Sequence, residues 1–174
     1  MMKPQFLSAM VLAGLFAATA LHGLEVPLPF KPQEIAARAK QEGLPDGLSV
    51  SAEGNALKIA ARSALAFEKA VTITQTANVP PQAAGRDAVV KIKVYGRNLD
   101  ASGTTVSVGD RTLPLPSGNF PWKSVSAKIK CPANGKLPVT ICLRKFSGTL
   151  MLQEPTAQIV LPGKLPANLK RKRR

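Results

Sequence analysis

The sequence predicts a two-sheet β-sandwich in this chain of 174 residues. From Ala70 onward, apolar and polar residues alternate with a period of two in a series of short runs, which is the pattern of strands that bury one face. Glycine and proline residues separate these runs. Short amphipathic strands with such breaks are typical of two sheets packed face to face. We therefore expect an all-β fold.

The N-terminal segment, residues 1–20, has the features of a secretory signal peptide. Lys3 gives it a basic start, residues 6–20 form an apolar run, and that run closes on the small residues Ala18-Thr19-Ala20. Roughly 15 apolar residues are fewer than the about 20 that a helix needs to span a bilayer. We therefore expect an exported protein (periplasmic, cell-surface or secreted) whose mature chain has no transmembrane segment.

Residues 21–44 are expected to form an extended and helical segment ahead of the sandwich. The prolines at its start favour an extended conformation. A short helix is then predicted over residues 32–41, because a proline is well placed at the first position of a helix, and Gly43 ends it. The expected apolar stripe of this helix consists of Ile35, Ala36 and Ala39.

Residues 45–162 form the predicted sandwich domain. A hairpin opens it, since residues 48–52 and 56–61 alternate around the turn-forming cluster Glu53-Gly54-Asn55. A last run, residues 149–152, leads through a proline turn to the end of the domain. The inward series of the strands between them are Val71 and Ile73; Val90, Ile92 and Val94; Val106 and Val108; Val125, Ala127 and Ile129; and Val139, Ile141 and Leu143.

The charge of the chain is strongly positive, with 24 Lys and Arg against 10 Asp and Glu. Six of the basic residues fall within residues 164–174, so we predict a disordered basic tail over residues 163–174. Such a tail is either solvated or in contact with an anionic surface, namely anionic lipid or acidic polysaccharide. Because the signal peptide would direct the chain away from nucleic acid, we expect no nucleic-acid partner.

Catalytic motifs are missing from the sequence. The only histidine, His22, lies next to the predicted cleavage site, so neither a Ser-His-Asp arrangement nor a histidine-based zinc site can be assembled. The ten carboxylates are scattered singly, and no glycine-rich phosphate loop is present. The sequence therefore predicts a protein that is not an enzyme and that needs no cofactor.

The two cysteines, Cys131 and Cys142, are candidates for a disulfide because export normally means an oxidising compartment. Their phases differ, however. Cys131 continues the inward series of its strand, whereas Cys142 lies with the outward Thr140 and Arg144. A bridge and two separate thiols are both compatible with the sequence.

Five landmarks follow one another along the predicted sandwich. They are GNALKI (54–59), VTITQTANVPP (71–81), AVVKIKVYGRN (88–98), WKSVSAKIKCP (122–132) and GTLMLQEPTAQIV (148–160). Their order resembles the galactose-binding-like jelly roll, and more narrowly it is similar to carbohydrate-binding modules of the jelly-roll type that are attached to polysaccharide-degrading enzymes. The resemblance covers about residues 45–161. It implies a jelly-roll sandwich that binds a carbohydrate without catalysis.

Where that family often ends the Gly-Thr strand on an aspartate pair near a structural calcium ion, this chain has Gln153-Glu154. One carboxylate falls short of the six to eight oxygen ligands that calcium takes. We therefore expect no metal.

The residues expected to bind a ligand are Tyr95, Trp122, Lys93 and Arg97. Tyr95, Lys93 and Arg97 share the outward phase of one strand, where an aromatic face can stack on a sugar ring and cations can hold an acidic glycan. The same pattern is compatible with a merely solvated sheet face. Trp122 has the outward phase of its strand, and it either contacts the ligand or caps the edge of the core.

Two functions are compatible with these features. The first is an exported, non-catalytic module that binds a carbohydrate or envelope polysaccharide, with an acidic glycan as the candidate ligand. It requires the four residues to converge on one groove. The alternative is a structural or assembly protein of the cell envelope that contacts another protein through the sandwich. That alternative requires an exposed apolar patch in place of a polar groove.

Overall fold

A computed structural model describes residues 24–159 of the chain. The predicted signal peptide (1–20), His22 and the basic tail (163–174) lie outside these residues. One helix, α1 (Pro32–Gln41), and a short 3-10 turn (Pro81–Ala83) accompany the strands. The strands are β1 (Leu24–Pro27), β2 (Leu48–Glu53), β3 (Ala56–Asn78), β4 (Asp87–Asp100), β5 (Thr104–Val108), β6 (Arg111–Leu113), β7 (Gly118–Lys130), β8 (Lys136–Gln153) and β9 (Thr156–Ile159).

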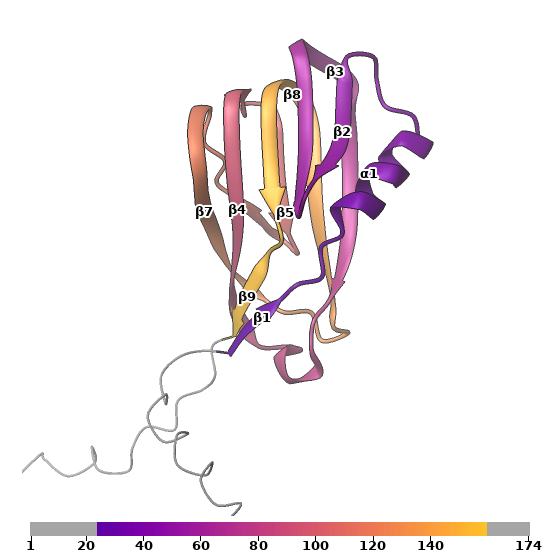
Figure 1. Ribbon diagram of the computed structural model, residues 1–174. Helices are drawn as coiled ribbons and strands as arrows, with labels where there is room; N and C mark the ends of the chain where they lie inside the picture. The colour runs from indigo at the N-terminus through magenta and orange to yellow at the C-terminus, as the bar shows by residue number, and fades with distance from the viewer. Residues whose placement is uncertain (1–23, 160–174) are drawn as a thin grey trace, which may run out of the picture. The chain divides into compact units, whose positions relative to one another are not determined.

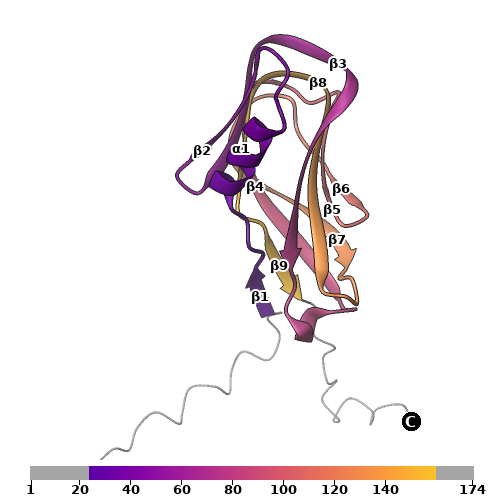
Figure 2. The same cartoon turned by 90° about the vertical axis from the view of Figure 1, so that its right-hand side faces the viewer.

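The strands form one antiparallel sheet that is folded into two layers (Figure 1). The first layer holds β2, β4 and β7 together with the first half of β3 and the second half of β8. The second layer holds β5, β6 and the remaining halves of the same two strands. The long strands β3 and β8 therefore pass from one layer to the other, as Figure 2 shows at the top of the molecule.

The predicted all-β sandwich is confirmed, and its two layers are connected more closely than the sequence indicated. We expected two separate sheets, whereas β3 and β8 continue through the bend and make the sheet continuous. Register shifts in β3 between Ala61 and Leu65, and again between Ala66 and Val71, accompany the bend. Such bulges add residues to one strand and increase its local bending. They also interrupt the period-two pattern, which is why the continuity is not visible in the sequence.

The core lies between the layers and is built from the inward residues of both. Its largest buried side chain is Phe146, which lies on β8 close to the bend. From the first layer it contains Leu57, Ile59, Val90, Ile92, Val94, Val125, Leu150 and Leu152, and from the second Ile73, Val106, Val108, Val139, Ile141 and Leu143.

The helix and the first hairpin have the predicted positions. In α1 the expected stripe is buried, and Gly43 follows the helix with a φ of 80°. Gly54, with a φ of 59°, lies in the turn that joins β2 to β3. Helix α1 lies beside β2 and β3 (Figure 1) and covers the side where these strands end the layers. No helix within residues 24–159 is long and apolar enough to cross a membrane.

The possible disulfide between Cys131 and Cys142 is not formed, and both thiols are free. Cys131 is buried at the end of β7, where its amide donates a hydrogen bond to the Arg86 carbonyl over 2.8 Å. Cys142 belongs to the second-layer half of β8, between Thr72 of β3 and Thr105 of β5. The difference in phase that the sequence indicated keeps the two thiols on different sides of their strands.

Candidate functional site

The outward face of the first layer carries the predicted site residues. Its strands align Tyr95 of β4 with Met151 of β8, Met151 with Lys58 of β3, and Lys58 with Ser51 of β2. One row of side chains therefore crosses four strands. The neighbouring row begins with Arg97, which is opposite Thr149 of β8.

An aromatic pair lies at the β4 end of the first row. The ring centroids of Tyr95 and Trp122 are 5.7 Å apart, and the ring planes are inclined by 42°. Trp122 is 40% exposed, and among the side chains that the structure describes it is the only large hydrophobic one that is well exposed. It is turned outward at a bulge, because the two residues of β7 between Phe120 and Lys123 lie opposite a single residue of β4.

A shallow cavity of about 570 Å³ adjoins this pair and is called the aromatic hollow below. Its floor forms where Gly96 of β4 meets the ring of Phe120. A Cβ on Gly96 would lie 2.2 Å from that ring, so the close packing requires glycine. The aromatic hollow is lined by Tyr95, Gly96, Arg97, Asn98, Asn119, Phe120 and Pro121.

A bulge in β4 sets the position of Arg97 and Asn98. Three residues of β4 after Gly96 span two residues of β7, and the two side chains at the bulge are both exposed. Asn98 has a φ of 49°, a left-handed conformation that asparagine tolerates better than most residues. The backbone amide of Asn98 donates a 2.6 Å hydrogen bond to the side-chain oxygen of Asn119. Strand β7 therefore holds the bulge in place.

Strand β3 bulges on the other side of β8, opposite the bulge in β4. The four residues of β3 that follow Ala61 span only two of β8, which leaves the intervening segment, residues 62–64, unpaired with β8. Between the two bulges lies Gly148 of β8, with a φ of 80°. A Cβ there would lie 2.2 Å from the carbonyl oxygen of Asn98, so only glycine permits this approach of β8 to β4.

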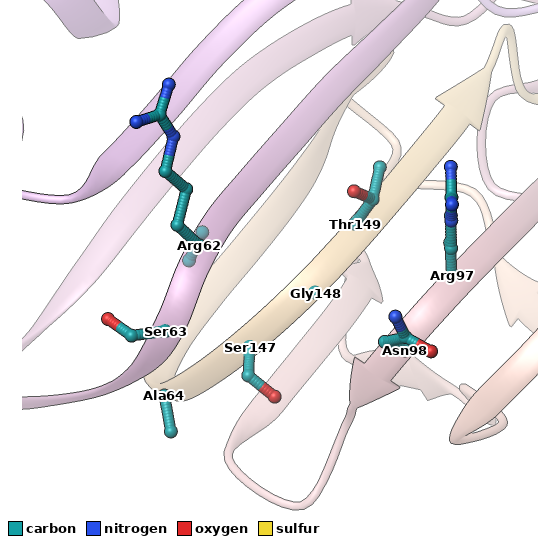
Figure 3. Close-up of a pocket in the computed structure, with 9 residues that line it drawn as sticks. Arg62, Ser63, Ala64, Arg97, Asn98, Ser147, Gly148 and Thr149 are labelled. Atoms are coloured by element: carbon teal, nitrogen blue, oxygen red, sulfur yellow. The ribbon is translucent and has the colours of Figure 1, made fainter.

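The two bulges and Gly148 enclose a second cavity of about 460 Å³, called the corner pocket below. Figure 3 shows Arg62 on one side of β8 and Arg97 on the other, with Gly148 between them. Arg97 and Asn98 line both cavities. The corner pocket is lined by Ala61, Arg62, Ser63, Ala64, Arg97, Asn98, Ser147, Gly148 and Thr149.

Three of the four residues that the sequence singled out lie together. Tyr95 and Arg97 line the aromatic hollow, and Trp122 contacts Tyr95. Lys93 lies on the same face of β4, opposite Ser124 of β7, but does not line the hollow. Sequence reasoning missed Arg62 and the whole corner pocket. The available signal was Gly148, because a glycine inside a strand pattern indicates a bulge or a close backbone approach.

The cations of this face lack acidic partners among the described residues. Arg62, Lys93 and Arg97 take part in none of the ion pairs that the structure contains between residues 24 and 159, and no group of three metal-ligating side chains occurs in that range. Asp100 is the acidic residue of β4 that is nearest to Arg97 in sequence. A backbone hydrogen bond from Ser102, 2.9 Å long, lowers the pKa of its carboxyl group, so this acid is kept ionised by its own turn.

Comparison with known proteins finds no matching family model and no matching curated protein. Solved structures do match, and they include carbohydrate-binding modules. In fold, this chain is similar to those modules. The module CBM1 of BiXyn10A is 16% identical, with a TM-score of 0.49, and the match covers 79% of this chain and 98% of the module.

Two further structures show the same likeness. The carbohydrate-binding module CBM6cm-2 of Cellvibrio mixtus lichenase 5A, solved with cellotriose, is 10% identical with a TM-score of 0.42, over 81% of this chain and all of the module. The enzymatically active domain of bacteriophage CBA120 tailspike protein 4 is 12% identical with a TM-score of 0.45. That match covers 67% of this chain and 18% of the tailspike chain. The likeness concerns the chain path, and no ligand or activity follows from it.

Proposed function

We propose that the domain is a non-catalytic carbohydrate-binding module whose ligand carries acidic groups. The observation that supports this most is the pair formed by the half-buried Tyr95 and the exposed Trp122, beside a hollow with polar walls. Sugar-binding sites combine an aromatic face, which contacts the C–H surface of the ring, with a few polar groups that bond the hydroxyls. Arg97, Asn98 and Asn119 are such polar groups here.

The preference for an acidic ligand is supported by the charge of the same face. Lys91, Lys93 and Arg97 project from alternate positions of β4 and are all exposed. None of them is part of an ion pair within the described range. Uncompensated cations in a row attract a polyanion, and guanidinium groups form charge-assisted hydrogen bonds with its acidic groups. Export, predicted from residues 1–20, would bring such a module to an envelope or extracellular polysaccharide.

The envelope-assembly alternative has less support. A protein-docking sandwich would be expected to expose a contiguous apolar patch. Of the side chains whose burial the structure describes, Trp122 is the one large hydrophobic side chain that is well exposed, and it adjoins the aromatic hollow through Tyr95. We therefore favour the sugar ligand.

A glycan array probed with the full chain, followed by calorimetry on the oligosaccharides that bind, tests the proposal. Trp122→Ala and Tyr95→Ala should each weaken binding by about tenfold or more, since an aromatic platform contributes one to a few kcal/mol beyond simple contact. Thr74→Ala, an exposed residue on the other layer, is the matched control and should bind like the wild type. Binding that survives both aromatic substitutions would exclude the aromatic hollow as the site.

A further inference from the structure

The corner pocket is a polar cavity to which the stacking of a sugar on the Tyr95–Trp122 pair assigns no role. It adjoins the aromatic hollow through Arg97 and Asn98, which line both cavities. Its volume of about 460 Å³ falls within the range of small-molecule sites. A ligand that stacks on Tyr95 therefore has a second, differently built cavity beside it.

Hydrogen-bond donors surround the corner pocket and no carboxylate lines it. Arg62 and Arg97 stand on opposite sides of β8 (Figure 3), and neither is part of an ion pair within residues 24–159. Ser147 and Thr149 of β8 also line the pocket with hydroxyl groups, and Figure 3 shows their side chains pointing in different directions. Two arginines that line one cavity without acidic partners make its electrostatic potential positive, so the arrangement favours a bound anion.

The distribution of these donors over three strands favours a tetrahedral anion over a planar one. A single guanidinium can engage both oxygens of a carboxylate through two parallel hydrogen bonds. Here the donors come from three strands, with Arg62 on β3, Arg97 on β4 and the hydroxyls on β8. A sulfate or phosphate ester has three terminal oxygens, which can meet donors from three sides at once.

We propose that the corner pocket binds a tetrahedral oxyanion ester, sulfate or phosphate, on a sugar next to the one that stacks on Tyr95. This inference rests on the proposed function for the neighbouring sugar, but the oxyanion site itself can be tested alone. The two bulges that flank Gly148 supply most of the lining, since Arg62 and Ser63 lie in the bulge of β3 and Arg97 and Asn98 in the bulge of β4.

The test uses the full chain labelled with ¹⁵N and titrated with glucose 6-sulfate, glucose 6-phosphate, glucuronate and glucose. The esters should shift the amide signals of Ser147, Gly148 and Thr149, whereas glucuronate and glucose should shift them far less. Comparison of the two esters identifies which oxyanion is preferred. Arg62→Gln should weaken ester binding by about tenfold, because it removes charge-assisted hydrogen bonds.

Arg111→Gln is the matched control, since it removes the same charge from an exposed arginine of β6 in the second layer. Equal binding of all four sugars, or equal weakening by Arg62→Gln and Arg111→Gln, would overturn the oxyanion site. The two proposals fail separately. Oligosaccharide binding that depends on Trp122 but leaves the β8 amides unchanged with the esters refutes the oxyanion site alone. If the esters bind at β8 but no oligosaccharide shows binding that depends on Trp122, the proposed sugar site at the Tyr95–Trp122 pair alone is refuted.

Discussion

Gly148 connects the fold to the candidate site at the level of a single residue. Its φ of 80° would strain any side chain, and the 2.2 Å approach of a hypothetical Cβ to the carbonyl of Asn98 excludes one. The same close approach places β8 against the bulge of β4, from which Arg97 projects. A residue that contributes no side chain therefore shapes both the aromatic hollow and the corner pocket.

Gly148→Ala should destabilise the protein by roughly 2–4 kcal/mol, because it adds a steric clash with backbone atoms to the strain of a left-handed conformation. Urea unfolding measures this loss. Gly54→Ala is the matched control, since Gly54 has a φ of 59° but open space where the Cβ would be. It carries the strain alone, about 1 kcal/mol. Equal losses for the two variants would contradict the close approach of β8 to β4.

At the level of elements, α1 connects the two layers along one side of the sandwich. The start of α1 is hydrogen-bonded to both layers. The backbone amide of Lys31 donates to the side-chain oxygen of Gln75, and the side-chain amide of Gln33 donates to the carbonyl of Gly54. Gln75 belongs to the second-layer half of β3, and Gly54 to the turn of the first layer. The helix also covers strands that would otherwise present free edges to other chains.

Ile35→Ala should cost roughly 2–5 kcal/mol of stability, because it leaves a cavity where α1 packs on the sheet. Ile35 is 2% exposed. The measurement is again the free energy of unfolding in urea. Ala37→Ser on the exposed face of α1 should change it by about 0.5 kcal/mol, the difference in helix propensity. If the two substitutions cost the same, α1 is not docked as described.

The elements also show how far the sequence could be interpreted. Period-two alternation predicted the inward residues of β4 and β8, and proline and glycine positions predicted α1 and the first hairpin. The outward phase of β4 likewise identified Tyr95 and Arg97. Arg62 could not be found in this way, because its place depends on bulges in two strands that are distant in the sequence. Register shifts follow from three-dimensional packing of the bend and leave no periodic signal.

At the level of the whole molecule, one continuous core joins both layers. Cys131 reports on it, being 1% exposed at the end of β7. Burial raises the pKa of its thiol, and the nearby carboxylate of Asp87 adds to the effect. The folded state therefore favours the protonated thiol. Its contribution to stability is complete below the ordinary pKa of a thiol and is lost as the pH rises toward the raised value.

The advantage of the wild-type Cys131 over Cys131→Ala should accordingly shrink between about pH 8 and about pH 10, since an unfolded thiol titrates near 8.5. Both proteins carry Cys142→Ala, so that Cys131 is the only thiol that differs between them. All other ionisable groups are common to both proteins, so their effects cancel in the difference. Urea unfolding at several pH values measures it. At neutral pH the protein that keeps Cys131 is the more stable of the two, because alanine leaves a small cavity at this position. A difference that stays constant over this pH range would mean that Cys131 ionises as readily in the folded state as in the unfolded chain, and that the end of β7 is open to water.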